Sequence, residues 1–287
     1  MAQTTKRVEG RQAGRGILGN VLLYAVLILF ALFFMLPLVW MGVTALKPPG
    51  EWLSPNWIPE RPTLENFSSI FNNPSLPILR WFVNSAAVAT VFTALVLLID
   101  ALAAYAYARM EFPGRNVLFA SLVSTLVMPS IIFLIPNYLT VATLGGLNSY
   151  WGIFTPGLAG VFGVFFLRQF FLSLPKELEE AALIDGAGIW TIFFKIVLPL
   201  SVPALSTLGI ITYLASWNDF LWPLLIVGND PLKQTLPVGL AKLQGAYVFE
   251  YGQLMAGAVI AALPVLILYL ALQRYIVQSV ASTGLKG

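Results

Sequence analysis

The sequence contains no cysteine and no histidine among its 287 residues. Their absence excludes thiol nucleophiles, Cys/His metal sites and catalytic triads that rely on histidine. Charge is scarce too, because Asp, Glu, Lys and Arg together make up only 10% of the chain. We therefore expect no metal site and no catalytic residue, and we predict that the chain is not an enzyme.

A nucleotide-binding loop of the Walker A type is also missing. That loop needs a Gly-Lys pair, and every lysine here follows Thr, Leu, Pro, Phe or Ala. The chain therefore cannot hydrolyse ATP by the P-loop mechanism, and we expect it to bind no cofactor of its own. Its 16 Lys and Arg lie mostly beside apolar runs rather than in one patch, so nucleic acid is not an expected partner.

Apolar residues dominate instead, at 58% of the chain. A bilayer core of about 30 Å is crossed by about 20 apolar helical residues. The sequence predicts an all-α, polytopic membrane helix bundle with six transmembrane helices. Several of these helices contain proline, which is tolerated in a bundle because neighbouring helices satisfy the backbone groups that proline frees. The six apolar segments are 17–46, 81–108, 117–136, 150–170, 202–227 and 254–277.

The order of these segments predicts the organisation of the chain. The first apolar run is about twice as long as the roughly 7–15 residues of a removable signal peptide, so we expect an uncleaved span. The predicted parts are a cytoplasmic N-terminus (1–16), a first span (17–46), an extracytoplasmic loop (47–80), a core with five spans (81–277) that includes a cytoplasmic loop (171–201), and a cytoplasmic tail (278–287).

The distribution of basic residues predicts the orientation of the spans. Cytoplasmic loops carry an excess of Lys and Arg, and an N-terminus placed inside puts eleven of these residues inside and five outside. Both termini are then cytoplasmic. The inner set is Lys6, Arg7, Arg11, Arg15, Arg109, Arg115, Arg168, Lys176, Lys195, Arg274 and Lys286, and the outer set is Lys47, Arg61, Arg80, Lys233 and Lys242.

A short acidic stretch, "KELEEAALIDGAG" at 176–188, stands out in the loop 171–201. We expect a helix with Pro175 in its first turn and Ser173 or a neighbour as its cap. Three glutamates then lie near the positive end of the helix dipole, and Gly186 and Gly188 end the helix. The predicted face at i, i+3, i+4 and i+7 spacing comprises Leu178, Ala181, Ala182 and Asp185.

Two interpretations of this helix are open. It either covers the inner end of the bundle or docks onto a soluble protein. A helix that lies on lipid is basic on its polar face, whereas this one is acidic, which favours a protein partner.

The spacing Glu180-Ala181-Ala182, Gly186, Ile196 and Leu198-Pro199 resembles the EAA loop of bacterial ATP-binding-cassette importer permeases. The stretches "WNDFLWPLLI" (217–226), "QTLPVGLA" (234–241) and "TGLKG" (283–287) resemble the carbohydrate-uptake branch, in particular the second permease subunit of maltose-type sugar importers. The resemblance extends from about residue 17 to the end of the chain.

This resemblance implies a permease that translocates a sugar or oligosaccharide across the bacterial cytoplasmic membrane by alternating access. Its implied partners are a homologous second permease, two cytoplasmic ATPase subunits that use ATP and Mg, an extracytoplasmic sugar-binding protein and membrane lipid. The residues implied to couple it to the ATPase are Glu180, Ala181, Ala182, Asp185, Gly186, Leu198 and Pro199.

Ionisable groups inside the spans are few. Asp100 and Asp219 should face the bundle interior or a water-filled path, because a carboxylate in lipid costs about 2.5–3.5 kcal/mol on insertion scales. Aromatic rings with amide or carboxylate groups suit sugars, so Trp217, Asn218 and Asp219, with Asn84, are candidates for the substrate pathway. The alternative is that these side chains hold spans together.

Other functions are less consistent with the sequence. An ion-coupled secondary carrier would show inverted repeats and a midplane ion site, and neither is evident. An importer permease for an amino acid, a peptide or an oxyanion is an alternative, as is a membrane scaffold that transports nothing. The sequence does not name the sugar.

The predicted orientation can be tested with single cysteines, since the chain has none of its own. We expect Cys at Pro62 or Gln244 to react with a membrane-impermeant thiol reagent added outside intact cells. Cys at Phe112 or Ala187 should stay unlabelled until the membrane is opened. The reverse labelling pattern would overturn the orientation.

Overall fold

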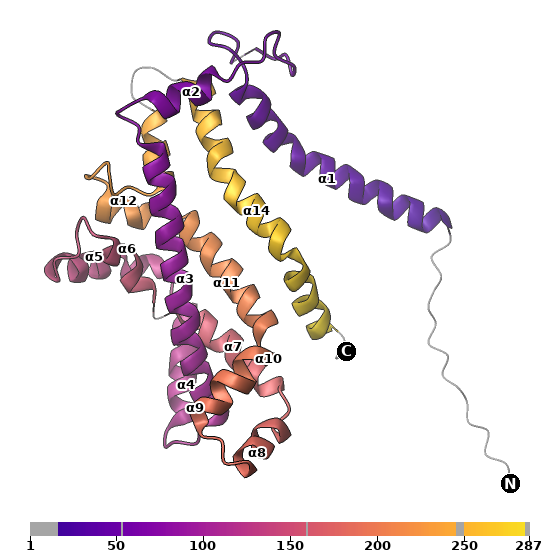
Figure 1. Cartoon of the computed structure of the whole chain (residues 1–287), viewed down its shortest axis with the longest axis vertical. Coiled ribbons are helices and arrows are strands. Elements are labelled where there is room, and N and C mark those ends of the chain that lie inside the picture. The colour runs from indigo at the N-terminus through magenta and orange to yellow at the C-terminus, as the bar shows by residue number, and fades with distance from the viewer. Residues whose placement is uncertain (1–16, 53, 159, 245–249, 285–287) are drawn as a thin grey trace.

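The computed structural model describes residues 17–52, 54–158, 160–244 and 250–284. Within these ranges all regular structure is helical (Figure 1). The predicted N-terminal segment 1–16 and the last residues, 285–287, lie outside the described ranges. The longest helices are α1 (Ile17–Ala45), α3 (Ile78–Arg109) and α14 (Tyr251–Gly284), so the last helix extends past the predicted boundary at 277.

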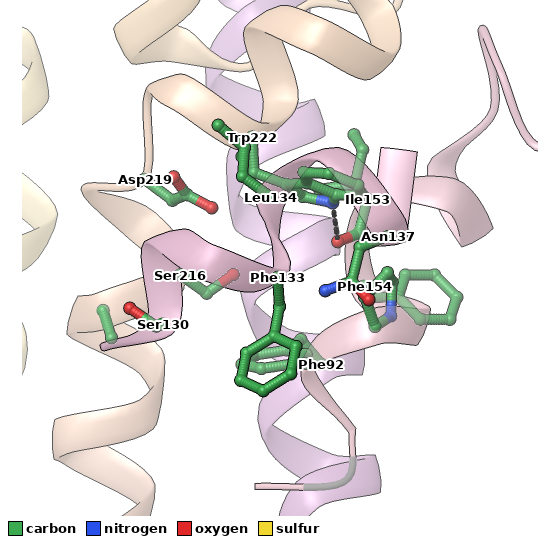
Figure 2. A pocket seen from close by; sticks show the side chains of 13 residues that line it. Phe92, Ser130, Phe133, Leu134, Asn137, Ile153, Phe154, Ser216, Asp219 and Trp222 are labelled. Atoms are coloured by element: carbon green, nitrogen blue, oxygen red, sulfur yellow. Dashed lines mark hydrogen bonds between the residues drawn. The ribbon is translucent and has the colours of Figure 1, made fainter. Parts of the chain in front are cut away.

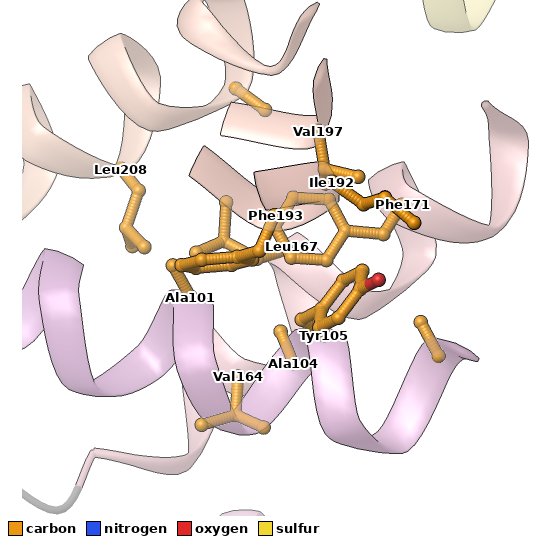
Figure 3. Packing of buried hydrophobic residues seen from close by; sticks show 12 residues of the cluster. Ala101, Ala104, Tyr105, Val164, Leu167, Phe171, Ile192, Phe193, Val197 and Leu208 are labelled. Carbon is orange, nitrogen blue, oxygen red and sulfur yellow. The ribbon is translucent and has the colours of Figure 1, made fainter. Parts of the chain in front are cut away.

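The centre of the bundle is α3, which packs against α7 (Val161–Ser173) and α11 (Val202–Trp217). Ala101, Ala104 and Ala108 repeat along one face of α3 and are all buried. Small side chains let helix backbones approach closely, which is how helices associate where lipid provides no hydrophobic driving force. Val164, Leu167 and Phe171 of α7 pack onto this face (Figure 3).

α3 and α7 approach each other closely at Gly163. A Cβ atom at this position would collide with the carboxyl group of Asp100 and would lie 3.0 Å from Cδ2 of Leu208. Asp100 is only 1% exposed, so it faces the bundle interior as the sequence predicts. Neither of its carboxyl oxygens has a hydrogen-bond partner among the described residues.

A second cluster lies at the opposite end of α3, beside α2 (Glu65–Asn72) and α13 (Leu236–Ala241). Trp81 fills its centre, and its indole Nε1 donates to the carbonyl of Pro231 at 2.7 Å. Asn66 of α2 donates to the carbonyls of Ala45 and Lys47, both at 2.8 Å, which ties the end of α1 to this cluster. Figure 1 shows that α2 and α8 (Glu177–Ile184) lie at opposite ends of the bundle.

Three of the predicted spans are not single helices. The segment 117–136 is divided among α4 (Arg115–Ser124), the 3₁₀ turns η1 (Thr125–Val127) and η2 (Ser130–Phe133), and α5 (Leu134–Thr143), with a bend of 96°. Proline disfavours helical backbone at the residue before it, and Met128 before Pro129 is extended at ψ 127°. Segment 150–170 is likewise divided into α6 (Tyr150–Phe154), η3 (Thr155–Gly157) and α7, and segment 202–227 into α11 and α12 (Leu221–Val227).

Length and composition allow three of the described helices to cross a membrane: Gly19–Ala45, Ile78–Arg109 and Tyr251–Ala271. Three bent helix pairs raise the number to six if each pair is one span, which equals the predicted count. The third pair, however, joins Ile189–Leu200 to Val202–Trp217, so it includes part of the predicted loop 171–201 and ends before the predicted boundary at 227. α1 slants away from the bundle (Figure 1), and its most apolar stretch buries no residue against the rest of the described chain.

Replacement of Gly163 by Ala tests the close approach of α3 and α7. A methyl group forced into a packed interface costs about 1–3 kcal/mol, so Gly163→Ala should lower the midpoint of thermal unfolding by several degrees. Gly42→Ala is the matched control, because a Cβ atom there meets nothing within 4 Å. Intrinsic tryptophan fluorescence in detergent measures both. Equal midpoints for the two variants would contradict the inferred packing.

Candidate functional site

The acidic segment forms α8, and its beginning differs from the prediction. Glu177, Glu179 and Glu180 do lie in the first turn, where their charges complement the helix dipole. Ser173, however, is the last residue of α7, and its hydroxyl donates to the carbonyl of Phe170. Lys176 is the N-cap residue and makes no side-chain cap. The predicted cap at Ser173 and helical Pro175 are therefore wrong, because the preceding helix extends further than expected.

The end of α8 agrees with the prediction. Gly186 has φ +82°, which L side chains adopt only with strain. The amide of Ala187 donates to the carbonyl of Ala182, and the amide of Gly186 donates to that of Leu183. This pair of bonds is the Schellman motif, which satisfies the last carbonyls of a helix and reverses the chain.

The predicted face of α8 is divided between two environments. Ala181 and Asp185 are exposed, as is Glu180, whereas Ala182 is half-buried against the core of α3 and α7. The reason is that successive residues of an α-helix lie about 100° apart around its axis, so Ala181 can be exposed while Ala182 contacts the core. Ala181 belongs to the outward surface and Ala182 to the inward one.

The chain continues into α9 (Ile189–Ile192), a π-helical turn η4 (Phe193–Val197) and α10 (Leu198–Leu200). Leu198 packs against the core, and Pro199 is exposed. Large apolar side chains are exposed in the segment from α8 to η4. An exposed apolar patch of this kind is typical of a surface that contacts another protein. The exposed side chains are Ile184 at 87% exposure, Trp190 at 66%, Leu183 at 56%, and Ile189 and Phe194 at 51% each.

A cavity of about 540 Å³ lies where the broken helices meet (Figure 2). Backbone that leaves helical geometry at membrane depth is tolerated where it is buried in protein or lines a water-filled space. The cavity lining combines aromatic rings with a few polar groups. Its residues are Phe92, Ser130, Phe133, Leu134, Asn137, Ile153, Phe154, Pro156, Gly157, Ala215, Ser216, Asp219 and Trp222.

Asp219 is the one pathway candidate that lines this cavity. It is half-buried, and the backbone amides of Phe220 and Trp222 donate to its carboxylate. Trp222 is held in turn by its indole Nε1, which donates to the carbonyl of Gly152 at 3.1 Å and to that of Ile153 at 3.0 Å. Figure 2 shows the bond to Ile153. Asp219 thus both organises the start of α12 and presents a carboxylate to the cavity.

The other pathway candidates do not line this cavity, and their place on a substrate pathway stays a prediction. Trp217 is 2% exposed, and its Nε1 donates to the carbonyl of Ala261 at 3.2 Å, so it joins α11 to α14. Asn218 is exposed, and its amide donates to the carbonyl of Leu214 in the preceding turn. Neither side chain lines the cavity.

Asn84 is a cross-link between segments. Its amide nitrogen donates to the carbonyls of Leu232 and Gln234, both at 2.9 Å, and its oxygen accepts from the Tyr150 hydroxyl at 2.9 Å. These three bonds use both amide hydrogens and one of the two lone pairs of the oxygen, so the cross-linking alternative describes the side chain. The sequence did not identify Ser216, Asn137 or the rings around them, because they converge from separate elements.

Within the described residues, no group of three or more carboxylates, histidines or cysteines is arranged to hold a metal ion. The structure thus presents two features: a polar-lined cavity among broken membrane helices, and a short turn-ended helix at one end of the bundle. Together they describe a helical bundle with a cavity among its broken helices and an exposed apolar patch at one end.

The chain matches the family described as the binding-protein-dependent transport system inner membrane component over residues 101–282. It is 34% identical over 98% of its length to the probable ABC transporter permease protein YurM of Bacillus subtilis, of which it covers 93%. The chain therefore belongs to this family and is an integral inner membrane component of a transport system.

Two further similarities agree with this assignment. The arabinooligosaccharides transport system permease protein AraQ of Halalkalibacterium halodurans is 39% identical over 80% of this chain and 81% of its own length. The crystal structure of a bacterial ABC transporter involved in the import of the acidic polysaccharide alginate contains a chain with TM-score 0.79 at 21% identity, over 96% of this chain and 99% of that one. The predicted all-α importer-permease fold and the predicted resemblance are confirmed.

Substitution of Asp219 tests whether its carboxylate serves the cavity. Asp219→Asn removes the charge and keeps the shape, and a hydrogen bond to a charged group is worth about 1.5–3 kcal/mol, so uptake should fall by at least roughly tenfold. Asn218→Ala, one residue away and outside the cavity, should transport normally. Uptake in membrane vesicles is compared at equal amounts of assembled complex. If Asp219→Asn instead reduces the amount of assembled complex but uptake per complex is normal, Asp219 has only a structural role.

Proposed function

We propose that this chain is the transmembrane permease subunit of an ATP-driven importer that moves a sugar or an oligosaccharide across the cytoplasmic membrane by alternating access. The observation that carries the proposal is α8, a rigid, turn-ended helix at one end of the bundle with an exposed surface of Glu180, Ala181 and Asp185. A small residue at the centre of such a surface allows another protein to approach its backbone closely.

The sequence lacks a Walker A lysine, so energy must come from another subunit. We propose two cytoplasmic ATPase subunits, which use ATP and Mg, and a homologous second permease. An extracytoplasmic binding protein would deliver the sugar to the opposite end, beside α2. Both termini and α8 would then face the cytoplasm. The protruding apolar side chains between α8 and η4 would be covered by the ATPase.

Sugar as the solute is supported by the relatives and by the cavity. Relatives are named for arabinooligosaccharides, diacetylchitobiose, trehalose/maltose and lactose. The cavity sets aromatic rings beside a carboxylate, an amide and hydroxyl groups, which suit the C–H faces and hydroxyls of a sugar. A small amino acid, a peptide or an oxyanion as the solute is the alternative that the test must exclude.

The test uses a strain that lacks this gene and a panel of arabinotriose, diacetylchitobiose, maltose and lactose. We expect the wild-type gene to restore uptake of at least one of them. Gly186→Arg should abolish that uptake, because a left-handed backbone costs roughly 1–2 kcal/mol for a residue with a Cβ atom and the charged side chain obstructs docking. Restored uptake of an amino acid, a peptide or an oxyanion and of no sugar would overturn the choice of solute.

A pair of alanine variants separates docking from folding. Ala181→Glu adds a long acidic side chain to the outward surface and should release the ATPase while the chain itself remains folded. Ala182→Glu buries a charge in the core and should reduce the amount of folded chain. Ala181→Ser is the conservative control and should transport normally. Co-purification of the ATPase with Ala181→Glu at wild-type levels, together with normal uptake, would contradict docking through α8.

A further inference from the structure

A buried ion pair joins α8 to the end of α3. Nε of Arg109 lies 2.6 Å from Oε1 of Glu179, and the two side chains are only 6% and 13% exposed. Arg109 is in the last turn of α3 and Glu179 in the first turn of α8. Each charge therefore also faces the favourable end of its own helix dipole.

The same two side chains recruit further elements. Nη2 of Arg109 donates to the carbonyl of Leu174 at 2.9 Å, where α7 ends, and the Tyr105 hydroxyl donates to Oε2 of Glu179 at 3.4 Å. The Tyr105 ring contacts Phe171 of α7 and Phe193 of η4, with centroids 6.5 and 5.1 Å apart (Figure 3). One cluster thus connects α3, α7, α8 and η4.

The ion pair between Arg109 and Glu179 opposes movement of α8 relative to α3 more strongly than apolar packing would. Pulling the guanidinium and the carboxylate apart would leave two unpaired charges in a buried site. The apolar side chains that α8 and its following turn pack against the core of α3 and α7 are small, Ala182 and Ala187. The ion pair therefore ties a displacement of α8 to a displacement of the end of α3.

The other half of the connection is α3 itself, which is continuous from Ile78 to Arg109. Phe92, on this helix, lines the cavity that Asp219 also lines. Arg109 lies 17 positions after Phe92, which corresponds to about 26 Å of helix at 1.5 Å per residue. A rigid helix of this length carries a movement at one end to the other.

We infer that Arg109 and Glu179, with Tyr105, form the joint through which movement of α8 reaches α3 and, along it, the central cavity. The inference rests on the proposed function, since it requires an ATPase to move α8. Arg109 and Glu179 are positioning residues: they transmit the movement and touch neither nucleotide nor solute.

The test compares Arg109→Gln, Glu179→Gln and the double variant in the whole complex, reconstituted in proteoliposomes. Two quantities are measured at equal amounts of complex: ATP hydrolysis and accumulation of whichever panel sugar the wild type transports. We expect the sugar moved per ATP to fall on the order of tenfold in each single variant, with the ATPase still bound. The double variant should be no worse than either single one, because both act through one contact.

Glu111→Gln is the matched control. It removes a carboxylate two residues after Arg109, but Glu111 is exposed, and sugar moved per ATP should equal that of the wild type. If the Gln variants fail to assemble, Arg109→Lys keeps the charge but loses the forked geometry, and it should still lower the ratio. A wild-type ratio in the assembled variants would overturn the joint.

A second measurement needs no sugar. Spin labels on cysteines at 111 and 177 report the distance between the end of α3 and the start of α8 in the complex. A narrow distribution, the same with and without trapped nucleotide, is expected when Arg109 and Glu179 are present, and a broad one in the Gln variants. Equal widths would overturn the joint. If the wild type transports none of the sugars, that result counts against the proposed function. The distance measurement would still decide whether Arg109 and Glu179 connect α8 to α3.

Discussion

Backbone carbonyls at breaks and helix ends need donors in an apolar surrounding, and this need governs much of the structure. Water is absent from the hydrocarbon core, so groups freed where a helix stops must be satisfied by protein. Side chains supply the donors at several such places among the described residues. The donor–acceptor pairs are Asn84 with Leu232 and Gln234, Trp81 with Pro231, Trp222 with Gly152 and Ile153, Asn66 with Ala45 and Lys47, and Arg109 with Leu174.

These donors allow broken helices, and the broken helices allow a cavity. Uninterrupted helices packed as tightly as α3 and α7 would leave no space at the centre of the bundle. The breaks before Pro129 and after Trp217 turn the chain aside, and the space that opens is lined by rings and by Asp219. The hydrogen bonds from Trp222 to Gly152 and Ile153 thus hold together two of the segments that line the cavity.

Exposed apolar side chains have a different significance in the membrane-spanning segments than on α8 at the end of the bundle. Phe33 on α1 is 67% exposed and Val127 on η1 is 86% exposed, and both lie in segments apolar enough for the bilayer, where lipid or another membrane subunit can cover them. Ile184 at 87% follows four charged residues at the end of the bundle. There an exposed isoleucine faces water unless a protein covers it, which is consistent with a docking surface on α8.

The sequence alone determined the class of structure and the location of α8, since both depend on local properties. Apolar runs of sufficient length predict membrane helices whatever their neighbours are, and the left-handed turn at Gly186 follows from a residue that tolerates it. Only the tertiary structure decided which spans are broken, that Ala182 points inward, that Trp217 and Asn84 hold the bundle together, and that Arg109 meets Glu179 across 70 residues. Those outcomes depend on which side chains converge from distant segments, and neither periodicity nor motif spacing contains that information.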